Sequence, residues 1–143
     1  MARTLSLKRI FFWPLILFLL NEFLSRATTV LDQFPWIDNP MHFLGGFLIV
    51  QSLDEIFQYL RWKGYYGKVH PLLYIAIMTA FVGTIAIAWE WHEFLRDTFF
   101  GEHTQPSQAD TMLDLFLGIV GGLLGAFLLQ IKNQRSTHRK TLR

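Results

Sequence analysis

The chain has 143 residues, of which 52% are hydrophobic, and it includes fourteen Phe and five Trp. This is the length of a single domain with the composition of a membrane protein. It has no cysteine, which excludes disulfide bonds and thiolate chemistry, so any metal must be held by His and carboxylates. The formal net charge is only +2, and the basic residues gather at the termini and in one short loop, which favours a membrane topology signal over nucleic-acid binding.

Four apolar stretches follow one another along the chain, each near the roughly 20 residues that cross a bilayer as a helix. They cover residues 10–27, 41–60, 71–95 and 111–131. The sequence therefore predicts an all-α, polytopic membrane protein in which four transmembrane helices form a bundle. Residues 1–143 are expected to make a single integral membrane domain that ends in a short basic cytoplasmic tail, 132–143.

The first stretch has an alternative interpretation as a signal peptide. MARTLSLKR resembles the basic region of such a peptide, and Ser25-Arg26-Ala27 loosely resembles a cleavage site. Glu22 and Arg26 fit this interpretation poorly, so a retained helix is favoured. Because these two residues lie four positions apart, they are expected to form an ion pair.

The charges of the loops predict the orientation, since Lys and Arg near helix ends prefer the cytoplasmic side. The basic residues of the N-terminus, of the loop RWKGYYGKVH and of the tail all fall on one side of a four-span arrangement. The other two loops, TTVLDQFPWIDNP and RDTFFGEHTQPSQAD, are dominated by acids and prolines. Both termini are therefore predicted in the cytoplasm, with the acidic loops facing outward.

Helical phase, at about 100° per residue, places the acids on the same faces as small residues. The three stripes are Asp38, His42 and Gly45 on the second predicted helix, Gly83, Ala86, Glu90, Glu93 and Asp97 on the third, and Asp110, Asp114, Gly118, Gly121 and Gly125 on the fourth. Small residues mark the surfaces where membrane helices approach closely, so these polar groups are expected to point inward. His92 lies about 200° from Glu90 and is expected to face elsewhere.

The inward-pointing acids are predicted to form one site near the outward ends of the helices, because ionisable residues at this depth are costly unless they pair or bind a cation. The predicted metal ligands are His42, Glu90, Glu93, Asp110 and Asp114, and the predicted catalytic bases are Asp38 and Asp97. Oxygen ligands with one imidazole suit Mg²⁺, Mn²⁺, Ca²⁺ or, less well, Zn²⁺. Alternatively, several carboxylates share protons and no metal binds.

Two of these residues also have a purely structural interpretation. Asp38, just before Asn39-Pro40, is well placed to cap the second helix. Ser107-Gln108-Ala109-Asp110 resembles a capping box at the start of the fourth. Both alternatives stay open, whereas Asp114, which lies one turn inside an apolar run, favours function.

Three sequence elements resemble one family. WIDNPMHFLGGF is similar to the D-x-x-x-H-F-x-x-G-F element of the YjdF-like bacterial inner membrane proteins, WEWHEF to their E-x-x-E element, and TQPSQADTMLD to their T-Q-x-x-x-x-D-T-x-x-D element. The resemblance spans roughly residues 36–125 and implies the bacterial inner membrane. Ser107 stands where an aspartate is expected in the family. More distantly, Asp114 with Gly121 and Gly125 resembles the last helix of VanZ-like teicoplanin-resistance proteins, which implies a role in the cell envelope; Gly118 replaces their asparagine.

Three functional interpretations remain. The first is a metal-dependent hydrolase or transferase that acts on a lipid or lipid-linked envelope substrate. The second is non-enzymatic: cation or headgroup binding, an accessory role, or transport, which with four helices would require a homo-oligomer. The third is purely structural. Membrane lipids are expected partners and nucleic acid is not; no serine or cysteine nucleophile motif supports covalent catalysis of those kinds.

Overall fold

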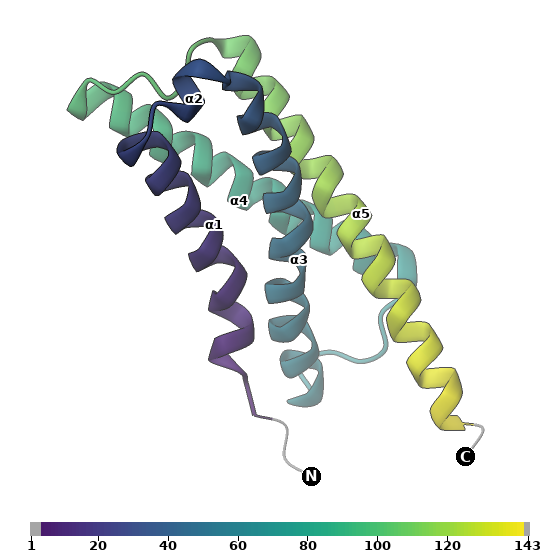
Figure 1. Cartoon of the computed structure of the whole chain (residues 1–143). Coiled ribbons are helices and arrows are strands. Elements are labelled where there is room, and N and C mark those ends of the chain that lie inside the picture. The colour runs from purple at the N-terminus through teal and green to yellow at the C-terminus, as the bar shows by residue number, and fades with distance from the viewer. Residues whose placement is uncertain (1–3, 142–143) are drawn as a thin grey trace.

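The computed structural model describes residues 4–141, without the side chains of Asp32 and of residues 135–141. Its helices, in chain order, are α1 (Leu7–Ala27), α2 (Val30–Gln33), the 3-10 helix η1 (Pro35–Ile37), α3 (Asp38–Trp62), α4 (Pro71–Phe100) and α5 (Gln108–Thr141). The four long helices run up and down, so that α1 begins and α5 ends at the same end of the bundle (Figure 1). The prediction of an all-α bundle is confirmed.

Each long helix extends beyond its predicted apolar stretch, because capping groups rather than hydropathy set the ends. The Ser6 hydroxyl accepts a hydrogen bond from the backbone N–H of Arg9 at the start of α1 (3.4 Å). Gly101 ends α4 in the left-handed conformation, with φ 66°, which glycine adopts without steric cost. At the start of α5, Ser107 Oγ accepts a hydrogen bond from the N–H of Asp110 (3.2 Å), as in the predicted capping box.

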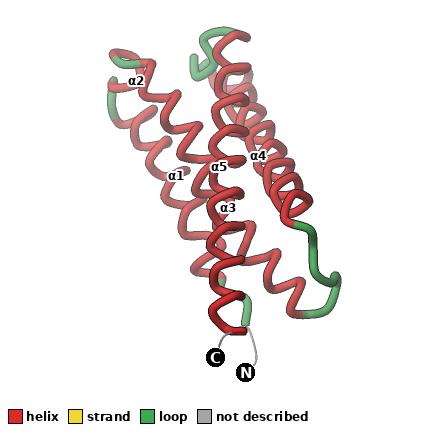
Figure 2. The backbone as a smooth tube through the Cα atoms, turned by 90° about the vertical axis from the view of Figure 1, so that its right-hand side faces the viewer, coloured by secondary structure: helices red, strands yellow, loops and turns green. Residues whose placement is uncertain are grey.

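Within the described residues, three helices, not the predicted four, are long and apolar enough to cross a membrane by length and composition: α1, α4 and Gln108–Gln134 of α5. The predicted span 41–60 is the exception. Its helix, α3, has 25 residues but carries the charged Asp54, Glu55 and Arg61 as well as His42. The helix can carry these polar residues because it packs against α1, α4 and α5 (Figures 1 and 2). Neighbouring helices, rather than lipid, therefore surround much of its polar surface.

Glycines on both helices bring α3 and α5 into close contact. A Cβ on Gly46 would collide with the carbonyl oxygen of Gly118, and one on Gly121 would collide with the carbonyl oxygen of Phe43. The predicted packing role of the small residues on α5 is confirmed. On α3 the prediction was one residue off, since a Cβ on Gly45 would meet no atom within 4 Å.

We expect Gly46→Ala to destabilise the protein by about 1–3 kcal/mol, because the added methyl meets backbone that cannot rotate away. Gly45→Ala is the matched control, and should be neutral or slightly stabilising, since alanine is preferred over glycine inside a helix. Unfolding of both variants in detergent, followed by circular dichroism, measures the difference. Equal stabilities would contradict the assignment of Gly46 to the contact.

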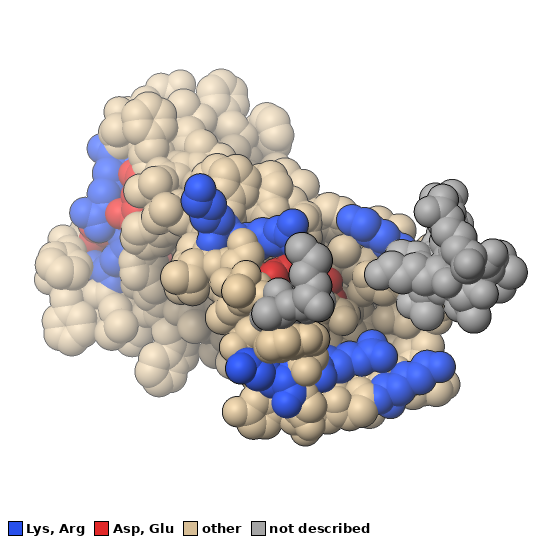
Figure 3. All heavy atoms as spheres, turned by 90° about the horizontal axis from the view of Figure 1, so that it is seen from below, with Lys and Arg blue, Asp and Glu red and all other residues tan. Residues whose placement is uncertain are grey.

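The end of the bundle where α1 begins and α5 ends is rich in Lys and Arg (Figure 3). The basic residues of the N-terminal segment and of the loop between α3 and α4 contribute to it. Glu55 of α3 lies nearby and pairs with Arg9 of α1 at 3.5 Å. The basic side chains of the predicted tail beyond residue 134 lie outside the described residues. This charge distribution is typical of the cytoplasmic end of a membrane bundle.

Candidate functional site

Three helices bring five of the predicted site residues together into what we call the acid–histidine cluster. It consists of Asp38 and His42 from α3, Glu90 and Glu93 from α4, and Asp114 from α5. Two overlapping groups within it could hold an ion, each with its ligand atoms within 4.8 Å of one another: Asp38, His42 and Asp114, and His42, Glu90 and Glu93. His42 belongs to both groups and is therefore the centre of the cluster.

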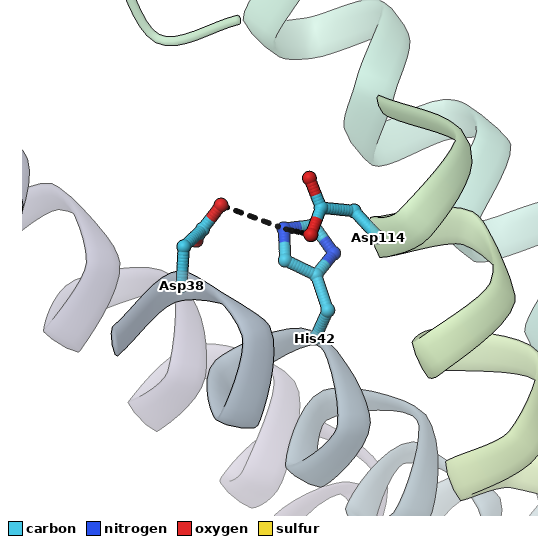
Figure 4. Close-up of side chains that lie close together, drawn as sticks. All are labelled: Asp38, His42 and Asp114. Atoms are coloured by element: carbon cyan, nitrogen blue, oxygen red, sulfur yellow. Dashed lines mark ion pairs between the residues drawn. The ribbon is translucent and has the colours of Figure 1, made fainter. Parts of the chain in front are cut away.

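The two ring nitrogens of His42 face different carboxylates. Nε2 lies 3.5 Å from Oδ2 of Asp38 and 3.9 Å from Oδ1 of Asp114. Nδ1 lies 3.9 Å from Oε1 of Glu90. Asp38 shares the helix face of His42 because it lies four residues earlier, and Asp114 approaches from α5 (Figure 4). The site is thus assembled at the helix contact that the glycines permit.

The cluster is largely closed to solvent and its hydrogen bonding is incomplete. The side chain of His42 is 8% exposed and that of Asp114 is 3% exposed. Oδ1 of Asp114 and Oε1 of Glu90 are buried and have no hydrogen-bond partner among the described residues. A buried carboxylate without a partner is strongly unfavourable, so these oxygens point to a group that completes the site.

Two other carboxylate oxygens of α4 accept hydrogen bonds. Oε2 of Glu90 accepts a hydrogen bond from Nε2 of Gln105 (2.9 Å), and Oε1 of Glu93 accepts one from the indole N–H of Trp89 (3.0 Å). These contacts fix the two side chains next to His42. Gln105 was singled out only as part of the T-Q element, and its contact with Glu90 was not predicted.

The structure does not bring Asp97 and Asp110 into either ligand group. Oδ1 of Asp97 accepts hydrogen bonds from the N–H of Thr104 (2.8 Å) and from its hydroxyl (2.7 Å), and Oδ2 accepts one from the N–H of Gln105 (2.9 Å). Asp97 therefore holds the loop that carries Gln105. Asp110 lies in the first turn of α5, where its N–H bonds to the capping Ser107.

The burial of Arg96, which lies about one turn after Glu93 on α4, was not predicted from the sequence. Arg96 is 3% exposed, and it donates to Glu22 (3.1 Å), to Ser25 (3.1 Å) and, through Nε, to Glu102 (2.6 Å). The predicted pair of Glu22 and Arg26 is confirmed at 2.7 Å and belongs to the same network. The many acidic residues near the end of α4 indicated that a basic side chain would pair with some of them. The sequence did not show that α1 supplies one of the acids that pair with Arg96.

An apolar cavity of about 320 Å³ adjoins the cluster between α1, α3, α4 and α5. Asp38 and His42 are part of its wall, and Asn21 of α1 adds a third polar side chain. The rest of the wall is almost entirely apolar or glycine: Pro14, Leu17, Phe18, Met41, Gly45, Gly46, Ile49, Val82, Ile85, Ala86, Trp89 and Gly118. His42 thus faces both the carboxylates and an apolar space.

Comparison with known families gives one match over most of the chain. A family model described as "Predicted membrane protein (DUF2238)" matches residues 1–135. The YjdF-like resemblance agrees with this match at the level of the family, whereas the VanZ-like resemblance is not shown. No curated protein and no solved structure matches the chain.

Proposed function

The chain belongs to the DUF2238 family of predicted membrane proteins, and we propose that it binds a divalent cation at the Nε2 edge of His42. The ligands are Oδ2 of Asp38, Nε2 of His42 and Oδ1 of Asp114. The buried Oδ1 of Asp114, which lacks a hydrogen-bond partner and faces this edge, is the observation that carries the proposal.

The spacing of these atoms suits a cation better than direct hydrogen bonds. The Nε2 atom of His42 lies 3.5 Å and 3.9 Å from the two carboxylate oxygens. Hydrogen bonds between such groups are about 2.7–3.2 Å long. Two neighbouring ligands that each lie about 2.1 Å from one ion are about 3.0 Å apart in an octahedron and about 3.4 Å apart in a tetrahedron. The 3.5 Å separation is close to the tetrahedral value, and the 3.9 Å separation is wider by a few tenths of an ångström.

Glu90 is a positioning residue in this proposal. A metal-binding histidine usually donates its other ring N–H to a carboxylate, which fixes the tautomer and the orientation of the ring. Oε1 of Glu90 faces Nδ1 of His42 at 3.9 Å, which is too long for a hydrogen bond, so this role requires the two side chains to approach each other when the ion binds. Gln105 holds the other oxygen of Glu90. Glu93 extends the negative charge on that side, and Asp97 and Asp110 are not part of the ligand set.

A donor set of two carboxylates and one imidazole suits Mg²⁺, Mn²⁺ or Zn²⁺. Three protein ligands leave coordination positions for water or for a substrate. A metal-dependent hydrolase or transferase that acts on a lipid is the second candidate function, and the apolar cavity beside His42 favours it. The basic end of the bundle supports cytoplasmic termini in the bacterial inner membrane, which would place the cluster near the outer face.

The test is calorimetric titration of the metal-free protein in lipid nanodiscs with Mn²⁺ and with Mg²⁺. We expect His42→Gln to weaken Mn²⁺ binding by at least about 100-fold, because even outer-shell changes cost 10- to 100-fold. Asp110→Asn is the matched control and should bind as the wild type does. A wild-type protein that binds neither ion, or a His42→Gln variant with unchanged affinity, would overturn the proposal.

Catalysis requires a second readout. Envelope lipids extracted from a bacterium should be turned over by the Mn²⁺-loaded wild type and not by His42→Gln. Cation binding without turnover of any lipid would support the cation-binding function and would contradict the hydrolase or transferase candidate.

A further inference from the structure

The apolar cavity is elongated and has one polar end. Along α3 its wall runs from Asp38 to Ile49, which is a distance of about 16 Å at 1.5 Å per residue. Asp38 and His42 lie at the end of the bundle opposite to the basic residues, and Asn21 lies near the same end of α1. Pro14, Ile49 and Val82 lie deeper, and their side chains are apolar.

Asn21 is an independent indication of a ligand. Its side chain lines the cavity, the residue is only 5% exposed, and it has no hydrogen-bond partner among the described residues. An amide in a largely apolar wall gains stability when a donor or acceptor meets it, so Asn21 marks where the polar part of a ligand would lie. The cavity is the space from which that group can reach it.

We propose that the cavity holds the single hydrocarbon chain of a membrane amphiphile whose polar head lies against Asn21 and the acid–histidine cluster. A volume of about 320 Å³ lies at the lower end of the range of ligand pockets, which fits one chain better than two. The contact of the head with a cation rests on the proposed function; the placement of the chain does not.

The position of α1 gives the amphiphile a way in from the bilayer. α1 packs mainly on α3 and makes much sparser contact with α4. The cavity lies between these elements, with Phe18 of α1 and Trp89 of α4 both in its wall and their rings 6.2 Å apart. A flexible chain entering sideways between α1 and α4 would stay in an apolar environment along its whole path.

The test uses lysophosphatidylglycerol with a photoreactive diazirine in its chain, added to the full-length protein in nanodiscs. Labelling, mapped by mass spectrometry, should fall mainly on cavity residues such as Ile49 and Ile85. Gly45→Leu fills the cavity at a site where a Cβ meets no atom within 4 Å, and should lower this labelling at least tenfold. Ala76→Leu adds the same bulk on an exposed part of α4 and should have no effect.

A second cavity-filling variant, Ile85→Trp, serves if Gly45→Leu does not fold. Equal labelling of the cavity in wild type and in the folded filled variant, or labelling of outer surfaces only, would overturn the proposal. Asn21→Leu should lower labelling by the lysophospholipid about twofold to tenfold, the value of one hydrogen bond, and leave labelling by a diazirine-bearing alkane unchanged. An Asn21→Leu variant that labels like the wild type would contradict the placement of the head.

The two proposals fail separately. Gly45→Leu leaves all cation ligands in place and should bind Mn²⁺ as the wild type does. Loss of cavity labelling with retained Mn²⁺ binding in this variant supports the inference. Cavity labelling in a wild-type protein that binds no Mn²⁺ would contradict the cation site alone.

Discussion

Replacing Arg96 by alanine is expected to destabilise the protein by about 1.5–3 kcal/mol, because it removes a buried guanidinium together with the hydrogen bonds that it donates to Glu22, Ser25 and Glu102. The Arg96 side chain is 4% exposed, while that of Glu22 is 20% exposed and that of Glu102 is 28% exposed. Its guanidinium joins α1, α4 and the loop after α4. Unfolding of the purified protein in detergent, followed by circular dichroism, measures the loss.

Arg26→Ala is the matched control for this prediction. Arg26 pairs with the same two acids, at 2.7 Å from Glu22 and 3.5 Å from Glu102, but its side chain is 53% exposed. Exposed pairs contribute about 0–1 kcal/mol, so this variant should remain close to the wild type. If both variants lost the same stability, burial of Arg96 would not be the cause.

Replacing Asp114 by asparagine is expected to change stability in opposite directions with and without a cation. In EDTA the variant should be more stable than the wild type by about 1–3 kcal/mol, because a buried charge with an unpartnered oxygen is removed. With Mn²⁺ at about 1,000 times the dissociation constant, the wild type should gain about 4 kcal/mol and the variant almost nothing. Thermal unfolding under the two conditions gives the comparison.

This crossover separates a ligand from a structural residue. A carboxylate that serves only the fold would lose favourable contacts on substitution, and Asp114→Asn would then be less stable under both conditions. Asp110→Asn, four residues earlier on the same helix and outside both ligand groups, should respond to Mn²⁺ as the wild type does. A destabilised Asp114→Asn variant in EDTA would therefore contradict the cation site.

Much of the cluster was predictable because helical phase is nearly fixed. Glu90, Glu93 and Asp114 share stripes with small residues, and these stripes are the surfaces on which α4 and α5 pack. The choice of Gly45 instead of Gly46 shows the limit of this argument, since neighbouring residues differ by about 100° and small deviations from ideal phase move the contact. Only the packed structure determines which of the two glycines faces α5.

Other features depend on contacts between distant parts of the chain. Arg96 binds Glu22, which lies 74 residues earlier, and no local pattern links the two. The oxygens of Asp97 are taken by Thr104 and Gln105, so its place on the predicted stripe did not reveal its role in the loop. The composition of α3 was judged as if lipid surrounded it, whereas three other helices pack against it. The cavity arises from all four long helices together and had no sequence signal.

Electron spin-echo spectroscopy of the Mn²⁺-loaded protein tests the central claim most directly, because it detects a nitrogen bound to the ion. Binding at the Nε2 edge predicts coupling to one imidazole nitrogen in the wild type. The coupling should vanish in His42→Gln, tested at Mn²⁺ concentrations that still load the site, and persist in His92→Gln, since the His92 ring packs against Phe18 and Trp89 instead of the carboxylates. Bound Mn²⁺ without nitrogen coupling, or coupling that survives His42→Gln, would contradict the proposed site.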